Sequence, residues 1–347
     1  MRNIPFEVHL LNCEFRKGVN FTGTNFAGTV DFRVSAFKAN ADFYQIKAAH
    51  SMVLENAVFE GPVDFASAKI EGNFEANGAA FRNKEQGANF NGMKVGNTAF
   101  FKNAVFEGTA HFDFANIACG FVASTAHFYN PESAASFSGF KAGQIALFQH
   151  AVFEGPVDFS DADFATITLW SVSWPSVATQ IEMRGMTYKY IRAAVKEPES
   201  HEALLWLANQ SSYARDVYSN LESFFFRQGY PADADKAFIA GKRREREQWE
   251  PTAKESIWEY LRSGRWCWWL GSMALDLLVG YGRHPWQAAI PCAALVALGL
   301  VLFSPEKMEL QKPEDTGRVY SRFWYSLGLF LPVVDLQADK VWKPKAD

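Results

Sequence analysis

A nine-residue block occurs three times in the first half of the chain, and successive copies start 47 residues apart. The copies begin at Ala57, Ala104 and Ala151, and the first and third both read AVFEGPVDF. Within and between the copies, bulky residues recur in steps of five or six, beginning with Phe15, Phe21, Phe26, Phe32, Phe37 and Phe43. Neither the 3.6-residue period of an amphipathic helix nor the alternation of a half-buried strand produces such steps. A repeat of this kind predicts a solenoid, in which each structural unit packs only on its neighbours.

A small or β-branched residue lies two positions before most of the bulky ones, as Ala104 precedes Phe106. This spacing suits a chain that turns a corner every five or six residues, so that both side chains point into one interior. At Phe74 and Ala76 the order of large and small is reversed, which keeps the volume that a filled core requires. We therefore expect four-sided coils that stack at roughly 4.8 Å, the spacing of β-strands, with Phe above Phe in columns.

Four segments carry the motif A-[DN]-[LF] most clearly: Ala41-Asp42-Phe43, Val63-Asp64-Phe65, Val157-Asp158-Phe159 and Ala162-Asp163-Phe164. On these residues the region 6–170 resembles the pentapeptide-repeat family. The resemblance implies a mainly β N-terminal half, folded as a right-handed quadrilateral β-helix. The step lengthens at residues 82–89 and again at 129–136, which predicts two outward loops on the same side of the coil.

Polar residues of the repeat have no arrangement typical of catalysis. Asp64 and Asp158 occupy its polar position, where a short carboxylate binds turn backbone, so we do not expect them to be general acids. His111, His127 and His150 lack the spacing of a metal site, and the four cysteines form no CxxC pair. The chain also lacks GxSxG, HExxH, phosphate-loop and GxGxxG motifs. We expect no enzyme activity, and no catalytic, cofactor-binding or metal-binding residue.

The second half of the chain changes to a helical pattern. Residues 175–250 predict a helical hairpin that covers the open end of the β-helix, with one helix over His201–Gln228 and a second over Asp233–Trp249. Gly229 suits the end of the first helix. The basic run Lys242–Arg246 suits either a solvated face or an anchor for lipid headgroups.

Apolar residues dominate the next two segments. Region 251–285 contains the Trp-rich stretch Trp266–Val279, which predicts an interfacial helix. The stretch 286–303 carries no charge over 18 residues and predicts one transmembrane helix in the α-helical C-terminal half; a buried helix of a soluble protein is the alternative. Basic residues concentrate before this stretch, which predicts that the β-helix lies in the cytoplasm. Region 304–347 forms a tail with one further short apolar segment.

Short motifs in this half resemble the tail of membrane-anchored bacterial pentapeptide-repeat proteins. They are Gly280-Tyr281-Gly282, Pro285-Trp286, Tyr325-Ser326-Leu327, the segment 331–336 and Trp342-Lys343-Pro344. The resemblance implies the bacterial inner (cytoplasmic) membrane. Members of this kind usually continue into another membrane helix, so we expect that the tail is shortened, and whether a second crossing is missing stays open.

Three functions are compatible with these patterns. The first is a non-catalytic, membrane-anchored scaffold whose rod binds a protein partner, in contact with the lipid bilayer and compatible with an oligomer. The second is an ion channel, because Val279-Gly280-Tyr281-Gly282 matches the core of a potassium filter, although Leu278 and Arg283 depart from it. The third is a DNA-mimicking topoisomerase inhibitor, but residues 1–170 hold 17 acidic and 12 basic residues, a net of only −5. The balance of 34 basic and 38 acidic residues argues against nucleic acid as a partner.

Overall fold

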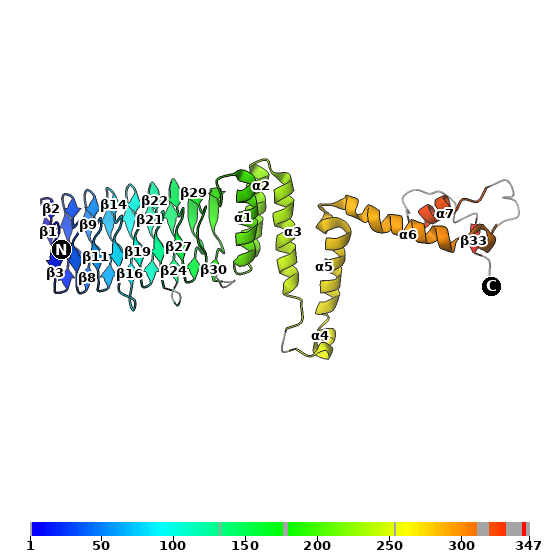
Figure 1. Cartoon of the computed structure of the whole chain (residues 1–347), viewed down its shortest axis with the longest axis horizontal. Coiled ribbons are helices and arrows are strands. Elements are labelled where there is room, and N and C mark those ends of the chain that lie inside the picture. The colour runs from blue at the N-terminus through cyan, green and yellow to red at the C-terminus, as the bar shows by residue number, and fades with distance from the viewer. Residues whose placement is uncertain are drawn as a thin grey trace. The chain divides into compact units, whose positions relative to one another are not determined.

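The computed structural model describes residues 2–130, 132, 134–175, 180–252, 255–310, 319–330 and 342–344. The chain forms two compact units, Met1–Glu245 and Arg246–Asp347, which we describe separately. The first unit is a parallel β-solenoid followed by helices, and the second unit is mainly helical (Figure 1). Both features confirm the fold class predicted from the repeat and from the change of periodicity.

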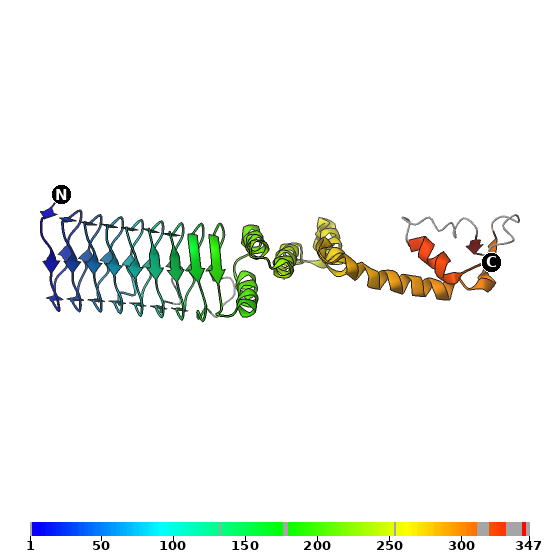
Figure 2. The same cartoon turned by 90° about the horizontal axis from the view of Figure 1, so that it is seen from above.

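Four short strands make one coil of the solenoid. Almost every strand pairs in parallel with the strands four positions before and after it, as β11 (Val58–Phe59) pairs with β7 (Ala36–Phe37) and β15 (Ala80–Phe81). The coils therefore present four faces, each a row of strands along the solenoid (Figure 2), and the longest row of one face contains eight strands.

The four faces consist of the following strands. The first face contains β1 (Asn3–Ile4), β5 (Asn25–Phe26), β9 (Lys47–Ala48), β13 (Lys69–Ile70), β17 (Lys94–Val95), β21 (Asn116–Ile117), β25 (Lys141–Ala142) and β29 (Asp163–Thr168). The second contains β2 (Val8–His9), β6 (Val30–Asp31), β10 (Met52–Val53), β14 (Phe74–Glu75), β18 (Ala99–Phe100), β22 (Gly120–Val122) and β26 (Ile145–Leu147). The third contains β3 (Glu14–Phe15), β7, β11, β15, β19 (Val105–Phe106), β23 (His127–Phe128) and β27 (Val152–Phe153). The fourth contains β4 (Val19–Asn20), β8 (Ala41–Asp42), β12 (Val63–Asp64), β16 (Ala88–Asn89), β20 (Ala110–His111), β24 (Ala135–Ser136), β28 (Val157–Asp158) and β30 (Ile181–Glu182).

The last coils differ from the others. Strand β29 is six residues long and pairs with both β25 and β26, so it joins the first two faces into one sheet. Strand β31 (Thr187–Arg192) extends this sheet by pairing with β29. The solenoid therefore continues past the phenylalanine repeat as far as Arg192.

Aromatic rings stack along the interior, as the spacing predicts. On the third face the rings of consecutive coils lie 4.6–5.2 Å apart, with planes within 9° of parallel, in the column Phe37, Phe59, Phe81, Phe106, Phe128 and Phe153. Ala104 and Phe106 are both fully buried. Phe74 and Ala76 are also fully buried, so the reversed order indeed keeps the interior filled.

The corners confirm the structural role of the repeat's carboxylates. Asp64 Oδ1 accepts a hydrogen bond from the backbone N–H of Ala66 at 2.8 Å, and Asp158 does the same with Ser160 at 2.7 Å. The two lengthened steps both connect the third face to the fourth, between β15 and β16 and between β23 and β24, so the loops share one side. Phe114 occupies a corner position with a φ of 56°, where most other coils carry Gly, Asn, Ser or Asp.

Three helices follow the solenoid in the first unit: α1 (Glu197–Gln210), α2 (Arg215–Arg227) and α3 (Pro231–Glu247). They lie at the end of the stack (Figure 2), and α1 and α2 contact β31, where Tyr188 packs edge-on against Phe224. The single helix predicted over His201–Gln228 is wrong. The chain breaks at Ser211, which forms a β-bridge with Ile181 of the last coil and thereby loses the helical conformation.

The second unit contains these elements: α4 (Ile257–Ser263), α5 (Arg265–Val279), the short turns η1 (Gly280–Gly282) and η2 (Pro285–Ala288), α6 (Ala289–Leu302), η3 (Pro305–Lys307), β32 (Met308–Leu310), α7 (Arg322–Phe330) and β33 (Trp342–Pro344). Strands β32 and β33 form an antiparallel pair. The predicted apolar segment near residues 323–336 is helical over α7, and residues 331–336 lie outside the described part of the chain.

Candidate membrane segment and binding faces

The segment Pro285–Leu302, formed by η2 and α6, carries no charged residue and is almost entirely exposed. Among the described residues it is the one helix that is long and apolar enough to cross a membrane. Ile290 and Val301 are 68% and 74% exposed. The alternative prediction, a helix buried in a soluble core, requires the opposite, and this exposure therefore suits contact with lipid.

Helix α5 also exposes apolar side chains, whereas two of its polar side chains, one helical turn apart, have hydrogen-bond or ion-pair partners within the protein. Asp276 lies 3.1 Å from the guanidinium of Arg246, and the Ser272 hydroxyl lies 2.7 Å from the Tyr281 hydroxyl. Trp268 and Leu277 are 68% and 73% exposed. A helix with internally paired polar groups and an apolar outer surface suits a membrane interface, because lipid offers no hydrogen-bond partner to an unpaired group.

The potassium-filter motif forms the turn between α5 and η2. Gly280, Tyr281 and Gly282 all have left-handed backbone conformations. The carbonyl oxygen of Val279 accepts a hydrogen bond from His284 N–H at 3.0 Å, and that of Gly280 accepts one from Arg283 N–H at 3.1 Å. Each of these two oxygens accepts one hydrogen bond within the turn, so the motif here forms the connection between two helical segments.

Helices α6 and α7 pack closely through small residues. A Cβ atom on Gly299 would lie 2.7 Å from Ser326 Cβ, so only glycine fits this crossing. Just past the end of α6, Phe303 packs edge-on against Tyr325 of α7, with ring centroids 5.0 Å apart. Small residues at a close crossing are typical of helix pairs in membranes.

Side chains that point outward from the strands form a different column on each face. The first face carries exposed lysines in the column Lys47, Lys69, Lys94 and Lys141. The third face carries partly exposed small and β-branched residues in the column Ala36, Val58, Ala80, Val105 and Val152. Charged residues flank that apolar column, with Lys38 and Glu60 paired at 2.5 Å. Glu14 and His127 also belong to this column, so five of its seven residues are apolar. The second face carries a shorter apolar run in Phe100, Val122 and Leu147, and the third face therefore has the more apolar column.

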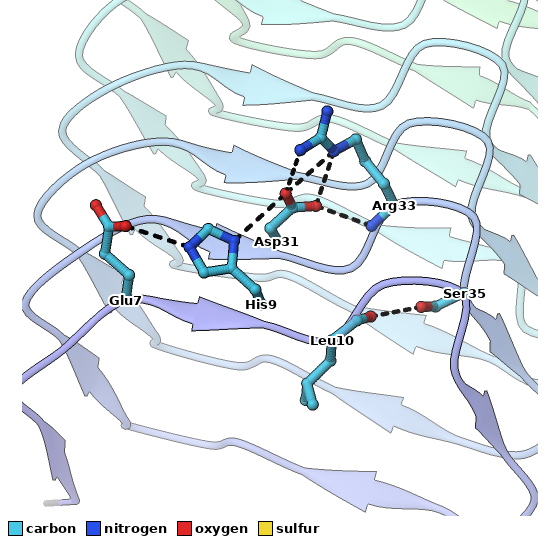
Figure 3. Close-up of polar contacts among 6 residues, drawn as sticks. All are labelled: Glu7, His9, Leu10, Asp31, Arg33 and Ser35. Atoms are coloured by element: carbon cyan, nitrogen blue, oxygen red, sulfur yellow. Dashed lines mark hydrogen bonds and ion pairs between the residues drawn. The ribbon is translucent and has the colours of Figure 1, made fainter.

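A polar cluster at the first two coils was not recognised in the sequence (Figure 3). The carboxylate of Asp31 is only 2% exposed, receives the Arg33 guanidinium at 2.6 Å and lies 3.6 Å from His9, which in turn contacts Glu7. Burial raises the pKa of Asp31, but the hydrogen bonds from Arg33 lower it by a larger amount. The net pKa therefore lies below its usual value. Ser35 donates to the carbonyl of Leu10 at 2.7 Å. The cluster joins neighbouring coils, and the positive charge of Arg33 balances the negative charge of Asp31. Both features suit a structural role.

A second unrecognised pair joins the helices of the first unit. His201 Nδ1 lies 2.8 Å from Asp233 Oδ2, although the two residues are 32 positions apart in the sequence. Of the histidines considered from the sequence, His111 lies 3.8 Å from Asp113, and no group of three metal-ligating side chains occurs among the described residues.

Comparisons with known proteins find no match: no family model, no curated protein and no solved structure matches the chain. The stacked parallel coils are consistent with a pentapeptide-repeat-like rod.

Proposed function

We propose that this protein is a membrane-anchored, non-catalytic scaffold of the pentapeptide-repeat family, located in the bacterial inner membrane. In this proposal the solenoid lies in the cytoplasm and binds a protein partner. The observation that carries the proposal is the exposed, uncharged segment Pro285–Leu302 in a chain that also builds a rigid solenoid.

The composition of α6 supports insertion into a bilayer. Its seven Leu, Ile and Val residues contribute about 2–4 kcal/mol together on the scale for membrane insertion. Leaving the same residues in water is correspondingly unfavourable, and the described residues cover only Val296 and Gly299 of this helix.

Carbonate extraction tests the anchor. We expect residues 1–248 to be soluble, and the full chain to stay in membranes after alkaline carbonate washing. Replacing Leu295 and Leu298 by lysine places two charges in α6, at a cost of about 5–7 kcal/mol near the bilayer centre, and should release the chain. A matched lysine at Val319, outside α6, should not. Release of the unaltered chain by carbonate would contradict the anchor.

The distribution of basic residues supports the orientation. Eight lysines and arginines lie between Lys242 and Arg283, against four between Ser304 and Arg322. Basic residues favour the cytoplasmic side, so the solenoid should be cytoplasmic. In intact cells, a cysteine placed at Val319 should react with an impermeant maleimide and one placed at Asn130 should not. The reverse pattern would exclude a cytoplasmic partner.

The third face is the best candidate for the partner's binding surface, because the column through Val58 and Val105 has more apolar residues than that of any other face, and exposed apolar patches mark protein interfaces. A photo-crosslinking residue at Val58 should capture a discrete partner in native cells. The same residue at Lys69, on the first face, serves as the matched control. Equal capture from both positions, or capture from Lys69 alone, would assign the interface elsewhere.

A further inference from the structure

A small cleft of about 60 Å³ lies between the last solenoid strand and the helices that cover it. Strand β31 contributes Tyr190 and Arg192, α1 contributes Ser200 and His201, and Gln228 and Tyr230 close the far side. All of these residues belong to the first unit. Apolar side chains, among them Ile191, Val195 and Phe224, complete the lining, so the cleft combines polar and apolar walls.

His201 is the buried ionisable group of this cleft. The residue is only 7% exposed, and its ring packs edge-on against Phe225 and Tyr230, with centroids 4.7 and 4.4 Å away. Its Nδ1 lies 2.8 Å from Asp233 Oδ2. Among the described residues, nothing pairs with its other nitrogen, Nε2. A histidine oriented by a carboxylate through one nitrogen presents the other to a ligand.

The charge of Asp233 decides which nitrogen of His201 carries the proton. Burial raises the pKa of Asp233, but hydrogen bonds from Lys236 and His201 lower it more, so the net pKa lies below its usual value and the carboxylate is ionised. An ionised carboxylate only accepts hydrogen bonds, so Nδ1 of His201 must donate. Nε2 is then an acceptor in neutral His201 and becomes a second donor when the ring is protonated.

One further feature favours negative charge in the cleft. Arg192 is exposed and its guanidinium makes no hydrogen bond or ion pair with the part of the chain that the structure describes, yet the residue lines the same cleft as His201.

We propose that this cleft binds a small oxyanion, held by Arg192 and by the protonated imidazole of His201. Guanidinium and imidazolium groups are strong donors to phosphate, sulfate and carboxylate oxygens. Asp233 of α3 contacts His201 and is itself paired with Lys236, and Arg192 of β31 lines the same cleft. An oxyanion offers only acceptor atoms, and Nε2 can donate to it only when the ring carries its second proton. Binding should therefore tighten as the pH falls.

Sulfate is a suitable probe, because its charge does not change over the range in which histidine titrates. The full chain in nanodiscs of zwitterionic lipid is titrated with sulfate by calorimetry at about pH 5.5 and about pH 8, on either side of an ordinary histidine pKa. We expect tighter binding at the lower pH. Arg192→Gln should weaken binding by about tenfold or more, the usual value of one charged hydrogen bond. Arg82→Gln removes another exposed arginine, far from the cleft, and this variant should bind sulfate like the unaltered chain.

The role of His201 is tested by His201→Gln, which should bind weakly and with no pH dependence. Circular dichroism establishes that this variant is folded, and Arg192 is exposed, so its replacement leaves the fold intact. Three results would overturn the proposal: no sulfate binding by the unaltered chain, unchanged binding by Arg192→Gln, or full pH dependence in folded His201→Gln. The proposed scaffold function does not depend on any of them.

Discussion

Truncating Phe106 to alanine is the most direct test of the interior columns. The side chain is fully buried, and its ring stacks on Phe81 at 4.7 Å and on Phe128 at 4.8 Å. Removing a buried Phe typically costs about 3–5 kcal/mol. Each of the two stacked pairs adds about 0.5–1.5 kcal/mol beyond the burial of its area. The expected loss in unfolding free energy therefore lies at the upper end, about 4–5 kcal/mol.

The surrounding coils resist collapse into the space that Phe106 leaves. The N–H of Val105 donates to Ala79 at 2.9 Å, and that of His127 donates to Ala104 at 2.9 Å, so backbone hydrogen bonds hold the neighbouring coils on both sides. A cavity that cannot close retains its full energetic cost.

Urea denaturation of residues 1–248, followed by circular dichroism, measures the loss. Phe114→Ala is the matched control, because Phe114 belongs to the same solenoid but is 72% exposed, and its truncation should change stability by less than about 0.5 kcal/mol. A loss below about 1 kcal/mol for Phe106→Ala, or equal losses for the two variants, would refute the assignment of Phe106 to the interior.

Two further predictions concern packing and pH. Gly299→Ala should weaken the crossing of α6 and α7 by about 1–3 kcal/mol, because its new Cβ meets Ser326, and Ser326→Gly should restore thermal stability in detergent only if that clash is the cause. The second prediction concerns Arg33→Gln, which removes the hydrogen bonds that lower the pKa of Asp31. Asp31 has a lower pKa in the folded chain than in the unfolded chain, where it is about 4, so its ionised form stabilises the fold at neutral pH. The loss of unfolding free energy in Arg33→Gln should therefore be full at neutral pH and vanish as the pH falls through the folded pKa. A difference that stays constant down to about pH 2 would show that Arg33 acts by packing instead of by charge.

The solenoid was predictable because its interior repeats in the sequence itself. Each coil buries one large side chain per face, so the burial of Phe106 and the reversed pair Phe74 and Ala76 follow directly from residue spacing. The last coil was harder to predict, because it buries Ile181 and Met186 in place of phenylalanine. Its strands therefore do not display the motif, although they pair with the preceding coils.

Features that depend on distant contacts could not be predicted. The helical period runs through Ser211 without interruption, and only the bridge to Ile181 of the last coil breaks the helix there. His201 and Asp233 belong to different helices, and no local pattern indicates that the turn between α2 and α3 brings them together. The cleft exists only because the helices fold back onto β31.

The 47-residue repeat has a consequence for the length of the rod. Phe59, Phe106 and Phe153 lie on the same face two coils apart, because from Phe59 onward coils of 22 and 25 residues alternate along this column and 22 + 25 = 47. A duplication or deletion of one such block would return every residue to its own face and change the rod by roughly 10 Å, two strand spacings. A block that is not a whole number of coils would move lysines, aspartates and valines onto each other's faces. Gene duplication can therefore adjust the reach of this protein in whole coils without altering the kind of surface that each face presents.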